Sequence, residues 1–163
     1  MLEFNTKCLR LLLIVIIFNL FSACSDESSP KILFDQGKYK KAYNLWEPLA
    51  NKGDLTAQNY IGIHHYLGLG TSRNHRLAKI WFEKAAIKDF ADAQYNLGVM
   101  YENGEFVKQD YVIAYMWFYL ANQNGNSNAA KHMEGMAEEH KLFPNQMKHA
   151  VELSKEIHYN KPE

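Results

Sequence analysis

The central part of this sequence repeats itself at an interval of 36 residues. The identical pairs are Ala57/Ala93, Gln58/Gln94, Gly62/Gly98, Gly68/Gly104, Ala78/Ala114, Trp81/Trp117, Phe82/Phe118 and Ala85/Ala121. Self-similarity at this period is typical of stacked supersecondary units, which bury their apolar faces against neighbouring units and present an extended surface. The repeat therefore predicts a binding protein rather than a catalyst.

Apolar residues recur at helical spacing through most of the chain, and no segment shows the strict alternation of a strand. We therefore predict an all-α fold, a solenoid of stacked antiparallel helix pairs. Helices are expected at 31–36, 39–51, 55–67, 75–87, 91–103, 109–122, 127–140 and 145–157. The units are a half-repeat at 31–54, full repeats at 55–90 and 91–126, and a degenerate capping pair at 127–163.

The repeated residues also predict how the helices pack. Small residues on the first helix of each unit leave room for aromatic rings on the second. The predicted packing residues are Ala57, Gly62, Ala78, Trp81 and Phe82, and their equivalents Ala93, Gly98, Ala114, Trp117 and Phe118. Residues 111–121 are apolar at every position, which predicts a helix buried on several sides, with contact to a partner as the alternative.

The first 30 residues have the composition of an export signal. Lys7 and Arg10 precede an apolar run at 11–21, which is shorter than a usual membrane span. Residues 21–24, Phe-Ser-Ala-Cys, resemble the lipobox of bacterial lipoproteins, although the family prefers Leu where Phe21 stands. This resemblance implies a signal peptide at 1–23, a lipid on Cys24 and a polar tether at 24–30. The alternatives are ordinary cleavage near Cys24 and an uncleaved anchor.

The charge balance narrows the possible partners, and the cysteine content limits how the fold can be stabilised. The chain carries 18 basic and 18 acidic residues, and this balance argues against binding to nucleic acid or docking through a polybasic surface. No cysteine follows Cys24, so a disulfide framework is excluded and packing alone must hold the fold.

The titratable residues show no arrangement typical of a metal site or a catalytic centre. His64 and His65 are adjacent and diverge by about 100° on a helix, while His132 and His140 are too far apart to share an ion. We therefore expect no cofactor and no metal, and interpret the seven histidines as solvated or facing a partner. Residues 134, 138 and 139 are glutamates on one predicted helix. We interpret their carboxylates as solvated surface groups rather than as an acid–base pair.

Residues 93–104, with Val107, Asp110, Ala114, Trp117, Phe118 and Ala121, resemble the Sel-1-like repeat, a relative of the tetratricopeptide repeat. The first full unit departs from the family at Tyr66, Asn74 and Asp89. The resemblance covers about 31–157 and implies a right-handed α-solenoid that scaffolds protein–protein contacts. In the register of such stacks, the concave wall would carry Asn59, Ile63, Tyr66, Tyr95, Val99, Glu102 and Lys131, although Ile63 and Val99 could instead pack within the stack.

These features together predict an interaction module of the bacterial cell envelope that binds a protein partner through its concave face. Ser25 after the cysteine favours, by resemblance to lipoprotein sorting rules, an outer-membrane lipoprotein facing the periplasm. One alternative is a cell-wall enzyme or penicillin-binding factor, because some exported relatives have been linked to that activity. Those relatives carry a disulfide in each repeat, whereas the repeats here have no cysteine. The other alternative is a structural spacer within an envelope complex.

Overall fold

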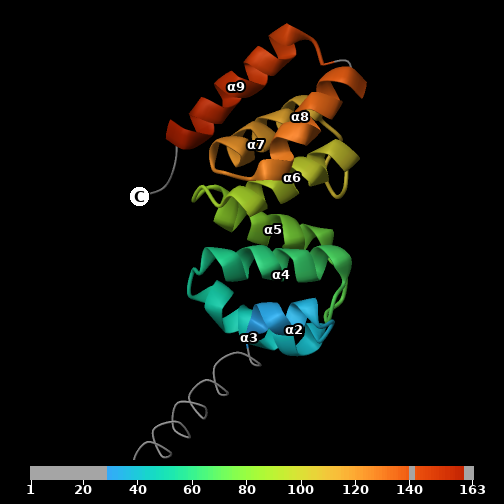
Figure 1. The fold of residues 1–163 in the computed structure, drawn as a ribbon, viewed down its shortest axis with the longest axis vertical. Helices are drawn as coiled ribbons and strands as arrows, with labels where there is room; N and C mark the ends of the chain where they lie inside the picture. The colour runs from blue at the N-terminus through green and yellow to red at the C-terminus, as the bar shows by residue number, and fades with distance from the viewer. Residues whose placement is uncertain (1–28, 140–141, 160–163) are drawn as a thin grey trace, which may run out of the picture.

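The computed structural model describes residues 29–139 and 142–159, in which every regular element is an α-helix. The helices are α2 (Pro30–Asp35), α3 (Tyr39–Asn51), α4 (Leu55–Leu67), α5 (His75–Ala86), α6 (Ala91–Asn103), α7 (Tyr111–Gln123), α8 (Ser127–Glu139) and α9 (Pro144–Tyr159). Each helix from α2 to α7 packs against the next, so the chain forms an elongated stack with α2 and α3 at one end (Figure 1). The predicted all-α solenoid of helix pairs is confirmed.

The ends of the helices follow from capping residues that the repeat supplies. Asp54, Asn74 and Asp110 precede α4, α5 and α7, and their side chains accept hydrogen bonds of 2.7–3.0 Å from amides of the first turn. Gly68 and Gly104 follow α4 and α6 in the left-handed conformation, with φ of 72° and 71°. The chain therefore makes the same turn after the first helix of each full repeat.

The predicted helix bounds need small corrections. Helix α7 begins at Tyr111 rather than 109, because Asp110 is its capping residue and has extended backbone. Helix α5 ends at Ala86 rather than at 87. At the other end of the chain, α9 begins with Pro144, whose fixed φ suits the first helical turn.

Close packing between the helices of each repeat centres on one glycine and one aromatic ring. The ring of Phe82 lies directly over Gly62, and the ring of Phe118 lies over Gly98 in the same way. A Cβ atom on Gly98 would lie 2.7 Å from two ring carbons of Phe118, which is well inside ordinary contact. The rings therefore occupy the space that a side chain at either glycine would need.

The other repeated packing residues are divided between the core and its margin. Ala57, Ala78, Ala93 and Ala114 are fully buried. Trp117 is also buried, whereas Trp81 is half-buried and the ammonium of Lys84 lies 4.0 Å from its ring centroid. The first repeat thus keeps its tryptophan at the edge of the core, where a cation can cover it.

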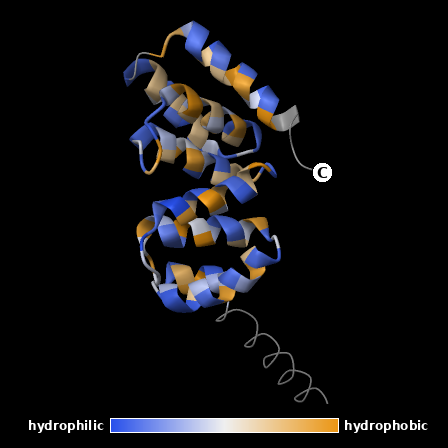
Figure 2. Cartoon of the chain, turned by 180° about the vertical axis from the view of Figure 1, so that it is seen from behind, coloured by the Kyte–Doolittle hydropathy of each residue, from blue (hydrophilic) through white to orange (hydrophobic). Residues whose placement is uncertain are grey.

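Helix α7 is buried on several sides, as its apolar sequence predicts. It packs against α6, α8 and α9. Met116, Trp117 and Leu120 belong to the core shared with α5 and α9, while Ala114 and Phe118 belong to a second core shared with α8. Figure 2 shows the hydrophobic residues of this region enclosed among the helices of the upper half of the stack.

A buried glutamine joins each full repeat to the unit before it. The side-chain amide of Gln58 donates to the carbonyl of Ala50 at 3.2 Å, and that of Gln94 donates to the carbonyl of Ala86 at 3.0 Å. Both carbonyls lie in the last turn of a helix, and each also accepts a main-chain N–H from the turn that follows, Gly53 for Ala50 and Asp89 for Ala86. Asn124 in turn donates to the side-chain oxygen of Gln94 at 2.9 Å. The repeated Ala-Gln pair is therefore a polar connection between units.

The amino-terminal features lie outside the described residues, including the apolar run at 11–21 and Cys24. Within the described ranges, none of the helices combines the length and the hydropathy needed to cross a membrane.

Candidate functional site

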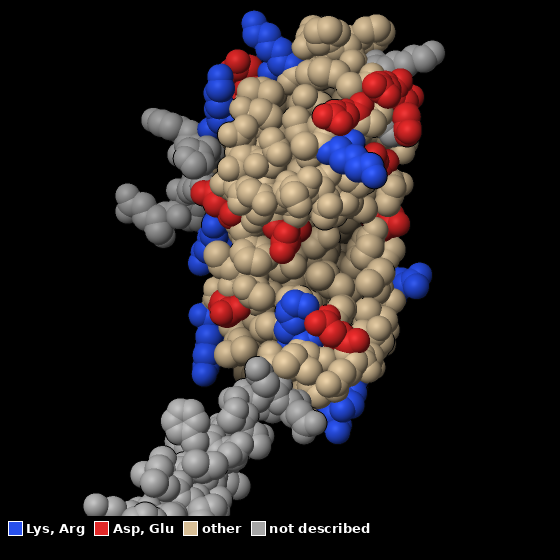
Figure 3. Space-filling model, in the orientation of Figure 1, with Lys and Arg blue, Asp and Glu red and all other residues tan. Residues whose placement is uncertain are grey.

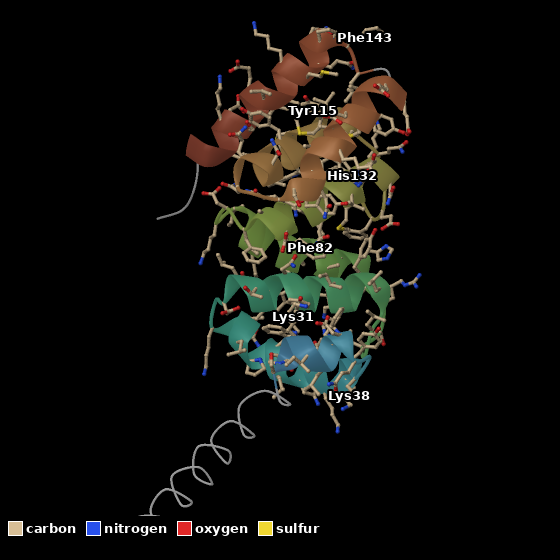
Figure 4. All side chains as sticks on the ribbon, in the orientation of Figure 1. Lys31, Lys38, Phe82, Tyr115, His132 and Phe143 are labelled. Carbon is tan, nitrogen blue, oxygen red and sulfur yellow. The ribbon has the colours of Figure 1, made fainter. Side chains whose placement is uncertain are left out.

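Two adjoining hollows form a groove along the face made by α4, α6 and α8. The first has a volume of about 450 Å³ and the second about 410 Å³. Tyr95 and Asn128 line both hollows, so the two lie next to each other. Lys31 lines the first hollow and His132 the second, and Figure 4 labels both on the face that Figure 3 shows as a space-filling surface. The first helices of successive units therefore build one wall, as solenoid geometry requires.

The first hollow is lined mainly by amides over an apolar floor. Asn96 of α6 donates to the side-chain oxygen of Asn59 of α4 at 2.8 Å, which joins the two helices. Asn126 donates to the carboxylate of Asp92 at 2.8 Å on the same face. The apolar part of the lining is Tyr60, Ile63 and Phe90. Side-chain amides carry both donors and acceptors, so this surface matches the chemistry of a polypeptide main chain.

The second hollow contains a chain of three hydrogen-bonded side chains. The hydroxyl of Tyr95 lies 2.8 Å from Nε2 of His132, and Nδ1 of His132 lies 3.2 Å from a carboxylate oxygen of Glu102. Burial, and after it the charge of Glu102, raises the pKa of Tyr95. A carboxylate can only accept, so Nδ1–H of His132 donates to Glu102, and Nε2 pairs with the Tyr95 hydroxyl. This arrangement holds the three groups in place.

Two aromatic rings pack against the imidazole of His132. Its ring stacks on Phe118 with centroids 4.8 Å apart and meets the edge of Tyr95 at 5.3 Å. Phe118 is the same ring that covers Gly98. The groove side chains thus rest on the repeat packing itself.

The predicted binding residues fall into two groups. Asn59, Tyr95, Glu102 and Lys131 line the groove, and so does Ile63. Of these, Asn59 is only 4% exposed, so it supports Asn96 rather than presenting its own surface. Val99 packs against the core around Phe118.

Tyr66 is placed elsewhere. Its ring stacks on His75 at 5.2 Å and lies 6.4 Å from Phe82. Burial, followed by the neighbouring carboxylate of Glu105, raises the pKa of Tyr66 to about 12. The ring is half-buried against the core, so its contacts are those of a packing residue.

The sequence reasoning missed His132, Asn96, Asn126 and Asn128. A signal for two of them, Asn96 and His132, existed. Asn59 and Asn96 are 37 residues apart, as are Tyr95 and His132, one more than the repeat length. Two positions 37 residues apart therefore face each other across the first helices of successive repeats. A search at that offset would have found both pairs.

The prediction that the histidines are solvated is wrong for His64 and His65, which are buried. Nδ1 of His64 lies 2.5 Å from the carbonyl oxygen of Leu69, and the rings of Phe34 and Tyr43 surround its imidazole. Burial lowers the pKa of both histidines. In the described ranges no group of three or more His, Cys, Asp or Glu residues is arranged to hold a metal ion.

Comparison with known sequences identifies the repeat. The Sel1 repeat family matches residues 55–90 and 91–126, the same ranges as the two repeats predicted above. Rat Protein sel-1 homolog 2 is 35% identical over 99 residues, which are 60% of this chain and 14% of that protein. HRD3B of Arabidopsis thaliana, an ERAD-associated E3 ubiquitin-protein ligase component, is 31% identical over 90 residues, 55% of this chain and 15% of that protein. The chain therefore spans about one seventh of the length of these relatives.

Solved structures share the fold. A protective antigen present in uropathogenic Escherichia coli strains, which displays an SLR (Sel1-like repeat) fold, aligns with a TM-score of 0.71 and 30% identity over 81% of this chain and 29% of that chain. A Sel1 repeat protein from Oxalobacter formigenes aligns with a TM-score of 0.63 and 28% identity over 78% of this chain and 54% of that chain. Two Sel1 repeats in the sequence and this stack of helix pairs show that the chain is a Sel1-like repeat protein.

Proposed function

We propose that this chain is a non-catalytic protein-binding module that holds an extended segment of a partner in the groove along α4, α6 and α8. The observation that carries the proposal is that the two hollows adjoin: they share Tyr95 and Asn128, and their linings extend from Lys31 to Glu139. Proteins with Sel1 repeats mediate protein–protein interaction, as the ligase component HRD3B illustrates. The protonated Tyr95 and its fixed partners also suit recognition better than acid–base chemistry.

Site-specific photocrosslinking tests the groove. A photoreactive benzophenone side chain at Asn128, in the shared part of the groove, should crosslink a partner protein in cells. The same group at Lys79 on α5 is the matched control, because Lys79 does not line the groove. A partner crosslinked equally from both positions, or only from Lys79, would refute the proposed face.

The role of Tyr95 can then be measured with the identified partner. Tyr95→Ala should weaken binding by about 2 kcal/mol or more, roughly thirtyfold, since truncating a buried aromatic anchor commonly has this effect. Isothermal titration with the full chain measures it, and Tyr66→Ala is the control because Tyr66 packs on His75 outside the groove. An equal loss in both variants would indicate a general structural effect rather than a lost anchor.

The proposal includes a location. We infer that the protein is exported and held by a lipid on Cys24 at the bacterial cell envelope, as an outer-membrane lipoprotein facing the periplasm. Lys7, Arg10, the apolar run at 11–21 and the Phe-Ser-Ala-Cys sequence support this inference. Cys24→Ser should leave an uncleaved, unlipidated precursor. Mass spectrometry of an unlipidated wild-type amino terminus would refute the anchor.

A further inference from the structure

The charges of this protein are segregated between the two walls of the stack, although the whole chain has a formal charge of zero. The groove-forming helices α4, α6 and α8 carry five acidic residues and one basic residue: Asp92, Glu102, Glu134, Glu138 and Glu139 against Lys131. Figure 3 shows acidic side chains gathered over the region of α8. Of the five acidic residues, Asp92, Glu102 and Glu139 line the two hollows, and the basic residues of the lining are Lys131 and Lys31 of α2, so the groove has a small excess of negative charge that the sequence total conceals.

The outer helices have the opposite balance. Helices α3, α5, α7 and α9 carry seven basic residues and four acidic ones: Lys40, Lys41, Arg76, Lys79, Lys84, Lys148 and Lys155 against Glu47, Glu83, Glu152 and Glu156. Opposite faces of the same stack thus differ in sign. A basic segment would be drawn to the groove face and away from the outer face.

The excess of negative charge lies in the second hollow. Glu102 and Glu139 line it from α6 and α8, with the Tyr95 ring and Met136 completing a partly apolar wall. The Glu102 side chain is only 18% exposed, so solvent screens its charge less than that of a fully exposed carboxylate. Lys131 is the one basic residue of the lining other than His132, and it is exposed.

Hydrogen bonding makes the hollow rich in acceptors. The Tyr95 hydroxyl is hydrogen-bonded to His132, and its oxygen keeps a lone pair that can accept from a ligand. The carboxylates of Glu102 and Glu139 accept as well. Ammonium and guanidinium groups are donors only, and they also bind well against an aromatic ring. A lysine or arginine side chain therefore matches the hollow, whereas a carboxylate or phosphate does not.

We propose that the hollow between α6 and α8 is the subsite for one lysine or arginine side chain of an extended, basic partner segment. This inference rests on the proposed function of the groove. The main chain of the segment lies along the amides of the first hollow, and the basic side chain enters the second hollow beside Tyr95, Glu102 and Glu139. The volume of about 410 Å³ is ample for one such side chain and falls in the range of small ligand sites.

A displayed library of random seven-residue peptides supplies the probe. Peptides are selected on the full chain and counter-selected on its Tyr95→Ala variant, so that the retained peptides depend on the groove. Lysine or arginine should be enriched at one position. In a synthetic copy of the best peptide, replacing that residue by norleucine should weaken binding about tenfold or more.

Variants of the hollow separate charge from folding. The double variant Glu102→Gln/Glu139→Gln should weaken binding of the basic peptide by a similar factor. It should change binding of the norleucine peptide by no more than about twofold, because only the basic peptide makes a charge interaction with these carboxylates. Lys131→Gln should act in the opposite direction and tighten the basic peptide about two- to threefold, since it removes a like charge from the rim. A gain of affinity cannot come from misfolding.

The outcomes distinguish the basic subsite from the proposed function of the groove on which it rests. If no selected peptide depends on Tyr95, the groove is not the binding surface and both proposals are wrong. If groove-dependent peptides carry no preferred lysine or arginine, or are unaffected by the two glutamine substitutions, the proposed function stands and the basic subsite is wrong. Enrichment of aspartate or glutamate at the same position would also overturn the subsite.

Discussion

Replacing Gly98 by alanine tests whether Phe118 is held rigidly between the repeat packing and the groove. A Cβ atom at Gly98 would lie 2.7 Å from two ring carbons of Phe118, whereas ordinary contact is 3.4–4 Å. The ring would have to move by roughly 1 Å. It has little room, because Phe118 is fully buried and flanked by Tyr95 at 5.4 Å and His132 at 4.8 Å between ring centroids.

The expected magnitude is a balance of two effects. Overpacking a core costs about 1–3 kcal/mol. Alanine in a helix interior returns up to about 1 kcal/mol relative to glycine. We therefore expect Gly98→Ala to lower the free energy of unfolding by about 1–2 kcal/mol, which corresponds to a fall in Tm of about 2–8 °C for a chain of this size.

Gly135 provides a matched control on the next groove helix. It lies within α8, and nothing lies within 4 Å of a Cβ built there. Gly135→Ala should therefore raise the stability by up to about 1 kcal/mol. Thermal and urea unfolding of the full chain, followed by far-UV circular dichroism, should show opposite signs for the two alanine variants.

A double-mutant cycle identifies the obstacle. Phe118→Leu removes the ring, so Gly98→Ala should cost clearly less in that background than in the wild type. The reasoning is refuted if Gly98→Ala is as stable as the wild type, or if its cost is the same with and without the Phe118 ring.

Three further predictions concern the loops and the buried polar groups. Gly70→Ala should cost at least about 1 kcal/mol more than Gly53→Ala by urea unfolding: both glycines have positive φ, but only at Gly70 would a Cβ meet main chain, at 2.6 Å from the start of α3. Because burial lowers the pKa of His64 and His65, the unfolded chain binds more protons below its ordinary histidine pKa of about 6.5. Stability should therefore fall as the pH drops below about 6.5, and denaturation midpoints between pH 7.5 and 5 should show less of this fall when both are replaced by glutamine. Gln94→Leu should lower the free energy of unfolding by about 1–3 kcal/mol, because the buried carbonyl of Ala86 loses its side-chain donor and the Asn124 amide loses its acceptor, and an unchanged urea midpoint would contradict this.

The fold could be predicted from the sequence because its determinants are local and repeated. The identical glycines and aromatic residues at an interval of 36 fix the helix pairs, and Asp54, Asp110, Gly68 and Gly104 mark the helix ends within a residue or two. Each of these residues acts through main-chain geometry or through size, which are properties visible in a single chain.

The groove was only partly predictable, since its details depend on contacts between helices. The register predicted that Tyr95, Glu102 and Lys131 share one wall, and all three line the second hollow. It could not show that Tyr66 would rest on His75, because that choice is made by packing in three dimensions. His132 was missed because it differs in residue type from Asn96, its repeat equivalent, and because its hydrogen bonds to Tyr95 and Glu102 join two repeats.

Helix α7 has a consequence for how this protein can be divided. One of its faces completes the core of the preceding repeat and another begins the core of the capping pair, so it belongs to two neighbouring units at once. Cutting the chain after residue 126 follows a repeat boundary in the sequence, yet it would uncover the apolar surface of α7 that α8 and α9 bury. The last two helices are therefore part of the smallest autonomous folding unit, and a library of shuffled repeats would have to move α7, α8 and α9 together.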